Sequence, residues 1–120
     1  MQRALLSLLV VGLAVAACGG GEPLKADAGP DFTVVAGNSP SFNGCNSTGD
    51  VVNYKWTVVS APETMAKDAG KVIREVDANC SFTLEDTMDL EELGEWVIEL
   101  EVRDASGNAA TDTVTVTVTQ

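Results

Sequence analysis

The residues of this chain that could take part in covalent chemistry are three cysteines, Cys18, Cys45 and Cys80, and a large number of carboxylates. The chain has no histidine, the usual general base for an activated serine or cysteine. A lysine–serine pair is compatible with the composition, but no known spacing stands out. Adjacent acids such as Glu91 and Glu92 do not provide the two carboxyl groups, facing across a cleft, that glycosidases need. We therefore expect a protein that is not an enzyme.

The first cysteine follows an apolar N-terminal run. Residues 4–17, ALLSLLVVGLAVAA, come after Arg3 and are short for a bilayer span, which needs about 20 residues. A positive charge, an apolar stretch and small residues in this order are typical of a secretory signal. The segment VAAC resembles the bacterial lipobox, which implies that residues 1–17 are removed and that Cys18 carries the lipid. The alternatives are an uncleaved anchor, a buried core helix, or an ordinary signal with an incidental cysteine.

A glycine-rich stretch follows the lipobox. We predict that residues 18–26, CGGGEPLKA, form the lipidated cysteine and a flexible tether, and that residues 27–120 form one domain. Gly19 takes the place where an aspartate would favour retention at the inner membrane of enteric bacteria. The expected location is therefore the bacterial cell envelope, at the outer membrane, facing the periplasm or the cell surface.

The other two cysteines have only each other as an intramolecular partner. Disulfides persist in exported proteins, and a Cys45–Cys80 bridge would close a loop of about 36 residues, which stabilises by about 4 kcal/mol in the loop-entropy account. Free buried thiols and a metal site are the alternatives. Without histidine or a CxxC motif, a zinc site is disfavoured. We predict the disulfide.

The net charge of the chain is −11. Nucleic acid and anionic lipid head groups both attract basic surfaces, so we expect neither as a partner. An acidic surface suits solubility, or binding to cations and basic partners.

From residue 27 onward the hydrophobic pattern has a period of two, which indicates strands. The segments predicted to be strands are 32–36, 41–43, 51–59, 71–76, 80–84, 95–104 and 111–119. Residues 84–95 are acidic and are expected to form a solvated connection or one helical turn. Short strands with turns roughly every ten residues predict an all-β, antiparallel β-sandwich of about seven strands.

The alternation also predicts which side chains face inward. On residues 51–59 the inward set is Val52, Tyr54, Trp56 and Val58, and on residues 95–104 it is Trp96, Ile98, Leu100 and Val102. We therefore expect Tyr54, Trp56, Trp96, Ile98 and Leu100 in the core. The alternative for the two tryptophans is an exposed surface that stacks on sugars or contacts a partner.

Three motifs resemble the PKD (polycystic kidney disease) domain family. They are AGPD at residues 28–31, the Tyr54-x-Trp56 pair, and VRDASGNAATDTVTVTV at residues 102–118. The similarity extends over residues 27–119. It implies an Ig-like sandwich on an extracellular protein, used as a spacer or as a module that contacts proteins or carbohydrates.

Some PKD domains bind calcium, and the resemblance implies where such a site would lie. Asp104 matches one of the acidic positions, but the loop that commonly reads DGSGSSDPDG reads NGCNSTG here. Asn43, Asn46, Asp50 and Asp104 would supply two carboxylates and two amides, which is few anionic ligands for calcium. We expect no cofactor, with calcium at these residues as the alternative.

These observations lead to one leading hypothesis and two others. The leading hypothesis is a lipid-anchored binding or spacer module that acts in protein–protein interaction or adhesion, with an envelope or extracellular protein as its partner. The second is a carbohydrate-binding module with a glycan ligand. The third is a purely structural envelope lipoprotein.

Overall fold

A computed structural model of the chain describes residues 23–84 and 92–120. Cys18, the predicted signal segment and most of the predicted 84–95 connection lie outside the described residues. The elements are β1 (Phe32–Val35), β2 (Ser41–Asn43), β3 (Val51–Ser60), the 3₁₀ helix η2 (Glu63–Asp68), β4 (Val72–Asp77), β5 (Ser81–Thr83), β6 (Gly94–Asp104) and β7 (Ala109–Thr119). All seven predicted strands are present; η2 was not predicted. In the described part of the chain, no helix has the length and apolar character needed to cross a membrane.

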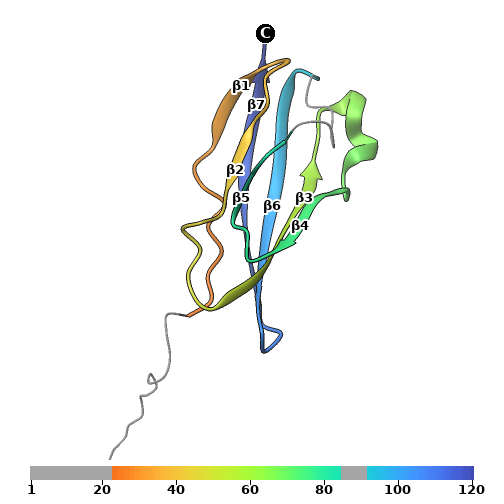
Figure 1. Cartoon of the computed structure of the whole chain (residues 1–120). Coiled ribbons are helices and arrows are strands. Elements are labelled where there is room, and N and C mark those ends of the chain that lie inside the picture. Colours follow the sequence, from red (N-terminus) through yellow and green to blue (C-terminus); the bar gives the residue numbers. More distant parts are fainter. Residues whose placement is uncertain (1–22, 85–91) are drawn as a thin grey trace, which may run out of the picture.

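The strands form two sheets that pack face to face (Figure 1). One sheet has the order β1-β7-β6-β3-β4, and the other pairs β2 with β5. Most pairs are antiparallel, but β1 runs parallel to β7, with Phe32 beside Val116 and Val35 beside Thr119. The predicted all-β sandwich is confirmed, with one parallel pair added. A pattern of alternation cannot reveal that pair, because it fixes which face a side chain takes and not the direction of a neighbouring strand.

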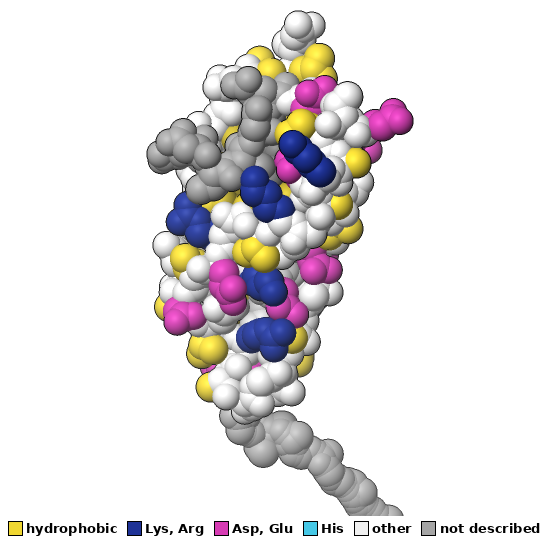
Figure 2. Space-filling view, turned by 90° about the vertical axis from the view of Figure 1, so that its right-hand side faces the viewer, with side chains coloured by type: hydrophobic (Ala, Val, Ile, Leu, Met, Phe, Trp, Pro, Cys, Tyr) yellow, Lys and Arg dark blue, Asp and Glu magenta, His cyan; other side chains and the backbone are white. Residues whose placement is uncertain are grey.

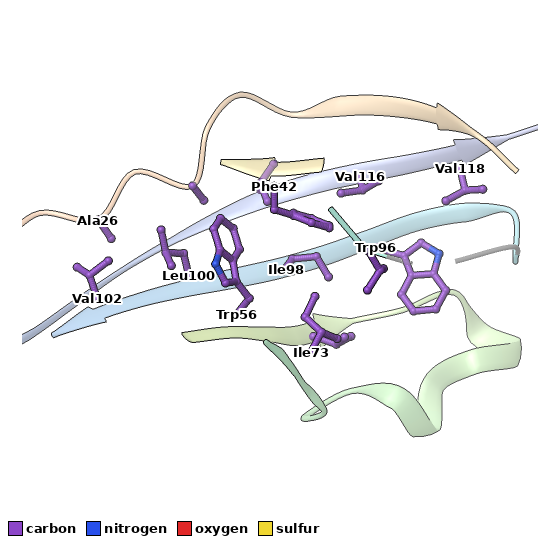
Figure 3. Close-up of a cluster of buried hydrophobic side chains, with 14 residues drawn as sticks. Ala26, Phe42, Trp56, Ile73, Trp96, Ile98, Leu100, Val102, Val116 and Val118 are labelled. Carbon is purple, nitrogen blue, oxygen red and sulfur yellow. The ribbon is translucent and has the colours of Figure 1, made fainter. Parts of the chain in front are cut away.

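The core lies between the sheets and follows the predicted alternation (Figure 3). Trp56 and Trp96 are fully buried, at 0% exposure each. The other fully buried large side chains come from the same strands and from their neighbours: Phe42, Val58, Leu84, Ile98, Leu100, Val102, Val114 and Val116. The prediction that the two tryptophans, Ile98 and Leu100 are core residues agrees with this burial.

The first residues of β3 depart from the prediction. Val52 is 42% exposed, whereas Val51 is half-buried and packs against the core. The register against β6 shifts between Val51 and Asn53, so a β-bulge reverses the inward face at this point. The inward position predicted for Val52 is therefore wrong. Tyr54, beyond the bulge, is half-buried at the margin of the core.

The strand directions give the sandwich two distinct ends. We call the end containing residues 23–27, 44–50, 77–80 and 104–108 the proximal end, because the N-terminal segment enters there (Figure 1). The turn between β6 and β7 closes at this end, where Arg103 pairs with Ala109. We call the opposite end the distal end. It contains the β1–β2 turn, η2 and Gln120.

The edge of the larger sheet formed by β4 carries mixed charge (Figure 2). The segment from β3 to β4 contains the basic residues Lys55, Lys67, Lys71 and Arg74 and the acidic residues Glu63, Asp68, Glu75 and Asp77. Charged side chains on an edge strand oppose pairing with a strand of another chain. This edge is therefore protected against sheet extension.

Candidate functional site at the proximal end

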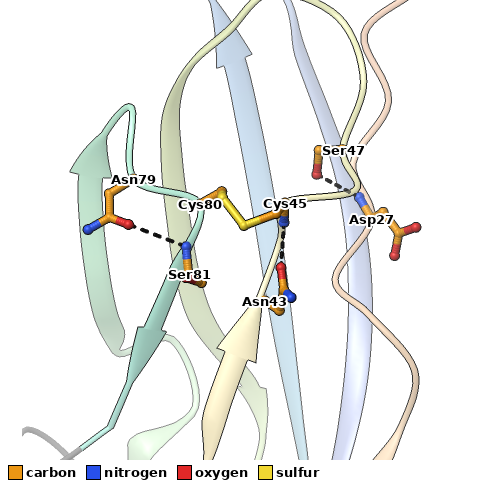
Figure 4. The surroundings of a disulfide bond; sticks show 7 residues. All are labelled: Asp27, Asn43, Cys45, Ser47, Asn79, Cys80 and Ser81. Atoms are coloured by element: carbon orange, nitrogen blue, oxygen red, sulfur yellow. Dashed lines mark hydrogen bonds between the residues drawn. A yellow bond between two sulfur atoms is a disulfide. The ribbon is translucent and has the colours of Figure 1, made fainter.

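The predicted disulfide is present at the proximal end. Cys45 and Cys80 are bonded, with their Cα atoms 4.8 Å apart (Figure 4). The bond joins the loop of residues 44–50 to the turn between β4 and β5. Beside it, the Gly44 N–H donates to the Cys80 carbonyl at 2.7 Å, which continues the β2–β5 ladder by one rung. In the same turn, Ala78 adopts a positive φ of 61°, a conformation that is unfavourable for a residue with a Cβ.

Two asparagine side chains shape the backbone next to the disulfide (Figure 4). Asn43 Oδ1 accepts a hydrogen bond from the Cys45 N–H at 2.7 Å. Asn79 Oδ1 lies 3.5 Å from the Ser81 nitrogen, a long contact of the same i to i+2 kind. Short polar side chains commonly stabilise turns in this way. Asn43, two residues before Cys45, and Asn79, directly before Cys80, thus contact the backbone of the two turns that the disulfide joins.

Gly44 lies directly above the core. A Cβ at this position would be 2.8 Å from Leu100 Cδ2, 3.2 Å from Trp56 Cζ2 and 3.3 Å from the Cys80 carbonyl oxygen. Atoms of a close-packed interior do not approach so closely, so only glycine fits here without a shift of its neighbours. The glycine therefore lets the disulfide-bonded loop lie against the Trp56 indole.

The loop of residues 44–50 also holds the N-terminal segment. Lys25 and Thr48 exchange two backbone hydrogen bonds, at 3.1 and 2.9 Å. Thr48 Oγ1 donates to the Pro23 carbonyl at 3.0 Å. Gly49 has a φ of +94°, and a Cβ there would be 2.8 Å from Leu24 Cα, so the two segments are in close contact. Residues 23–26 were predicted to belong to a flexible tether, but the structure places them on the domain, with Ala26 buried.

Hydrogen bonds of two carboxylates fix the AGPD segment to β7. The Ala28 N–H donates to Asp112 Oδ2 at 2.8 Å, and the Thr115 N–H donates to Asp31 Oδ1 at 2.9 Å. Ala28 itself is buried. The sequence marked Asp31 only through its family motif. Asp112 has the parity of the buried valines Val114 and Val116, so a carboxylate on the inward-facing side of β7 was the signal that could have found it. Together these bonds bring the N-terminal segment to the start of β1.

Asp104 closes the turn between β6 and β7. Its carboxylate accepts the side-chain N–H of Asn108 at 3.0 Å and the backbone N–H groups of Ser106 and Asn108 at 3.0 and 2.9 Å. These donors, the Asn108 side chain foremost, hold the pKa of the Asp104 carboxyl below its ordinary value. The structure therefore gives Asp104 a role in the turn.

Two residues of the alternative calcium site, Asp50 and Asp104, lie close together, since Asp104 pairs with Val51, the neighbour of Asp50. Asn43 lies at the end of β2 and pairs with Ser81. Asn43 Oδ1 and both Asp104 oxygens already accept hydrogen bonds within their own turns. These oxygens would have to give up those bonds to coordinate a cation. Among residues 23–84 and 92–120, no three histidine, cysteine or acidic side chains lie together as a metal cluster. The structure tests neither the expectation of no cofactor nor the alternative of calcium at these residues.

The aromatic side chains form an internal cluster. Phe42 packs against Phe32, Trp56 and Phe82, with ring centroids 5.2–5.8 Å apart. The Arg74 guanidinium lies 4.8 Å from the Phe82 ring centroid, where it covers the side of the cluster. Both tryptophans are fully buried, so neither provides a surface on which a sugar could stack.

Exposed apolar side chains lie mainly away from the proximal end. The exposed large hydrophobic residues among those described are Val35, Val52, Val59, Val72 and Leu93. Val35 is at the end of β1 beside Thr119, and Leu93 precedes Gly94, which pairs with Val118. Both therefore lie at the distal end, where a shallow hollow is lined by Ala36, Gly37, Leu93 and Gln120. Val59 lies near the end of β3, on the outer face of the larger sheet.

Comparison with known proteins identifies similar domains. The family model described as the K319L-like PKD domain matches residues 28–118. A fibronectin(III)-like module structure of Clostridium thermocellum CbhA is 16% identical, with a TM-score of 0.53 over 82% of this chain and 98% of that chain. The solution structure of the PKD domain from KIAA 1837 protein is 21% identical, with a TM-score of 0.51 over 85% of this chain and 92% of that chain. At these identities the two structures show the fold alone. A comparison with curated proteins finds no match.

Proposed function

The chain belongs to the K319L-like PKD domain family, and from this premise we propose that it is a non-catalytic envelope module, anchored by lipid on Cys18, that binds a protein partner. PKD domains commonly serve as interaction or spacer modules and are generally non-catalytic. The observation that carries the proposal is that the two ends of the sandwich differ. The N-terminal segment is bound at one end, and exposed apolar side chains lie toward the other.

The attachment point decides which end would face the membrane. Pro23 is the first described residue and is bound by Thr48. The chain between Cys18 and Pro23 reaches at most roughly 18 Å when fully extended. An anchor at Cys18 would therefore keep the proximal end near the head groups and direct the distal end outward.

The outer face of the larger sheet toward the distal end combines apolar and acidic side chains. Val59 lies there near Val97, whose partner on β3 is Ser60, and Glu95 and Glu99 flank Val97 on β6. Apolar groups bordered by charges of one sign suit a partner surface that carries apolar and basic side chains. The proposed partner is accordingly an envelope or extracellular protein with such a surface.

The lipid anchor is tested by labelling cells with radioactive palmitate. The wild-type protein should incorporate the label and remain with the membrane fraction. The Cys18→Ala variant should not incorporate it and should no longer depend on detergent for extraction. An unlabelled wild-type protein would show that the anchoring part of the proposal is wrong.

The distal interaction surface is tested with two matched substitutions on one strand. Val59 and Val52 are exposed valines of β3, at 47% and 42%, but they lie toward opposite ends. We expect Val59→Asp to abolish chemical crosslinking of the anchored protein to its envelope partner, and Val52→Asp to preserve it. Equal crosslinking of both variants would exclude the distal surface as the contact.

Carbohydrate binding is the second candidate function. A sugar-stacking platform would have to use aromatic groups other than Trp56 and Trp96, which are buried. Specific binding on a glycan array that survives Val59→Asp would favour this function over protein binding. A purely structural role predicts that deletion weakens the envelope although no crosslinked partner forms.

A further inference from the structure

The chain contains a single Asn–Gly pair, Asn43–Gly44, which lies next to the disulfide. In such a pair the backbone nitrogen of the glycine can attack the asparagine side-chain amide carbon. Glycine is the most permissive following residue because it has no Cβ to hinder the attack and its backbone is the most flexible. Asn43 is exposed, so water reaches its side chain.

Both residues of this pair are required by the fold. Gly44 cannot carry a Cβ, because Leu100, Trp56 and the Cys80 carbonyl occupy the space. Asn43 supplies the side-chain oxygen that accepts the Cys45 N–H at 2.7 Å. Core packing and turn formation therefore place a chemically labile pair at the end of β2.

The atoms that would react are the ones that the fold holds in place. The attacking nitrogen belongs to Gly44, and its N–H is bonded to the Cys80 carbonyl at 2.7 Å. The amide under attack belongs to Asn43, and its oxygen is bonded to the Cys45 N–H. Cys45 and Cys80, which supply these two partners, are the residues joined by the disulfide. Ring closure would break the first bond, because Gly44 N loses its hydrogen.

We propose that the Cys45–Cys80 disulfide protects Asn43 from deamidation and that its reduction makes Asn43 a modification site. A thiol reductant converts the disulfide to two cysteine thiols and is itself oxidised to a disulfide. Gly44 N then loses its proton and attacks Asn43 Cγ, and ammonia leaves, which forms a five-membered succinimide. Water opens the ring at either carbonyl, giving aspartate or isoaspartate at position 43.

The product would change the proximal end permanently. Aspartate adds a negative charge where an uncharged amide stood, and isoaspartate adds a carbon to the backbone beside Gly44. The loop of residues 44–50 also holds Lys25 through Thr48, so its distortion affects the docking of the N-terminal segment. Reoxidation of the cysteines does not reverse either change.

The test uses the full-length protein in detergent, incubated at mildly alkaline pH with or without dithiothreitol. Peptide mass spectrometry measures deamidation at Asn43, and isoaspartyl methyltransferase labelling detects the isoaspartate product. We expect reduction to accelerate the loss of Asn43 by about tenfold or more, which corresponds to a decrease of about 1.4 kcal/mol in the free energy of local opening. Asn46 and Asn79 in the same protein serve as internal references, because neither is followed by glycine.

Two variants separate local protection from overall stability. Cys45→Ser/Cys80→Ser should deamidate at Asn43 without reductant, as fast as the reduced wild-type protein. Asp112→Asn keeps the disulfide but weakens a contact elsewhere, and it should remain protected when oxidised. Equal rates in the oxidised and reduced wild-type proteins would overturn the proposal. Deamidation of oxidised Asp112→Asn at the rate of the reduced protein would overturn it too, because global opening would then be the cause.

Discussion

Replacing Gly44 by alanine tests the packing of the disulfide-bonded loop on the core. The added methyl group would lie 2.8 Å from Leu100 Cδ2 and 3.2 Å from Trp56 Cζ2. Overpacking of this kind costs about 1–3 kcal/mol. The φ of Gly44 is not positive, so alanine gains roughly 0.4–1 kcal/mol from the smaller entropy of the unfolded chain. The net expectation is a decrease of about 1–2 kcal/mol in the free energy of unfolding.

The assay is urea unfolding of the oxidised protein, followed by tryptophan fluorescence. For a domain of this size, each kilocalorie per mole corresponds to a decrease in Tm of about 4–8 °C, so calorimetry gives an independent reading. Leu100→Val supplies the decisive second measurement, because it shortens the side chain that meets the new methyl group. The double variant should be more stable than the sum of the two single effects predicts.

Two results would contradict a clash between residue 44 and the core. A Gly44→Ala protein as stable as the wild type would show that the loop relaxes away from the core without cost. Strictly additive effects with Leu100→Val would show that the cost arises elsewhere, for example at the Cys80 carbonyl.

Three further predictions concern the core and two carboxylates. Trp56→Ala should lower the free energy of unfolding by about 3–5 kcal/mol, because a large side chain at 0% exposure leaves a cavity; a loss below about 1 kcal/mol in urea unfolding would contradict its place in the core. Asp112→Ala should cost about 1–3 kcal/mol, because the Ala28 N–H loses its acceptor, whereas Thr113→Ala on the outer face should cost little; similar losses would refute this role. Because hydrogen bonds from Asn108 and its neighbours lower the pKa of Asp104 in the folded state, its stabilisation is present above the pKa of the unfolded chain and is lost as the pH falls through the lower folded pKa. Acid titration of stability should therefore show a smaller difference between wild type and Asp104→Asn at low pH than at neutral pH, and a constant difference would contradict the argument.

The sequence predicts the strands well because the alternation of apolar and polar residues that marks a strand lies within the strand itself. Alternation along β6 and β7 places each side chain on one face, and the structure keeps that assignment along both strands. The inward position predicted for Val52 was wrong because a bulge shifts the register of β3 against β6. A bulge depends on the partner strand and not on the segment itself. The parallel direction of β1 was missed for a related reason, since β1 and β7 are distant in the chain.

The candidate site was only partly predictable. The Cys45–Cys80 bond followed from counting cysteines together with the expectation that the chain is exported, and the structure contains this bond. Nothing in the sequence indicated that Thr48 bonds the N-terminal segment, because a threonine in a loop carries no information about its hydrogen-bond partner. The need for glycine at position 44 also could not be read from the sequence, because Leu100 and Trp56 approach it from another part of the chain.

The two ends of the sandwich differ in how strongly their residues depend on one another. At the proximal end, the disulfide, the Lys25–Thr48 bonds and the contact of Gly44 with the core are interlocked, so a change in one disturbs the others. The exposed side chains toward the distal end, such as Val59, are not part of this network. Substitutions at the proximal end should therefore alter stability first, and binding only through it. Substitutions at the distal end should alter partner binding with little change in the free energy of unfolding. A distal variant that loses both together would mean that the two ends are coupled through the core, and binding and stability could not then be changed separately.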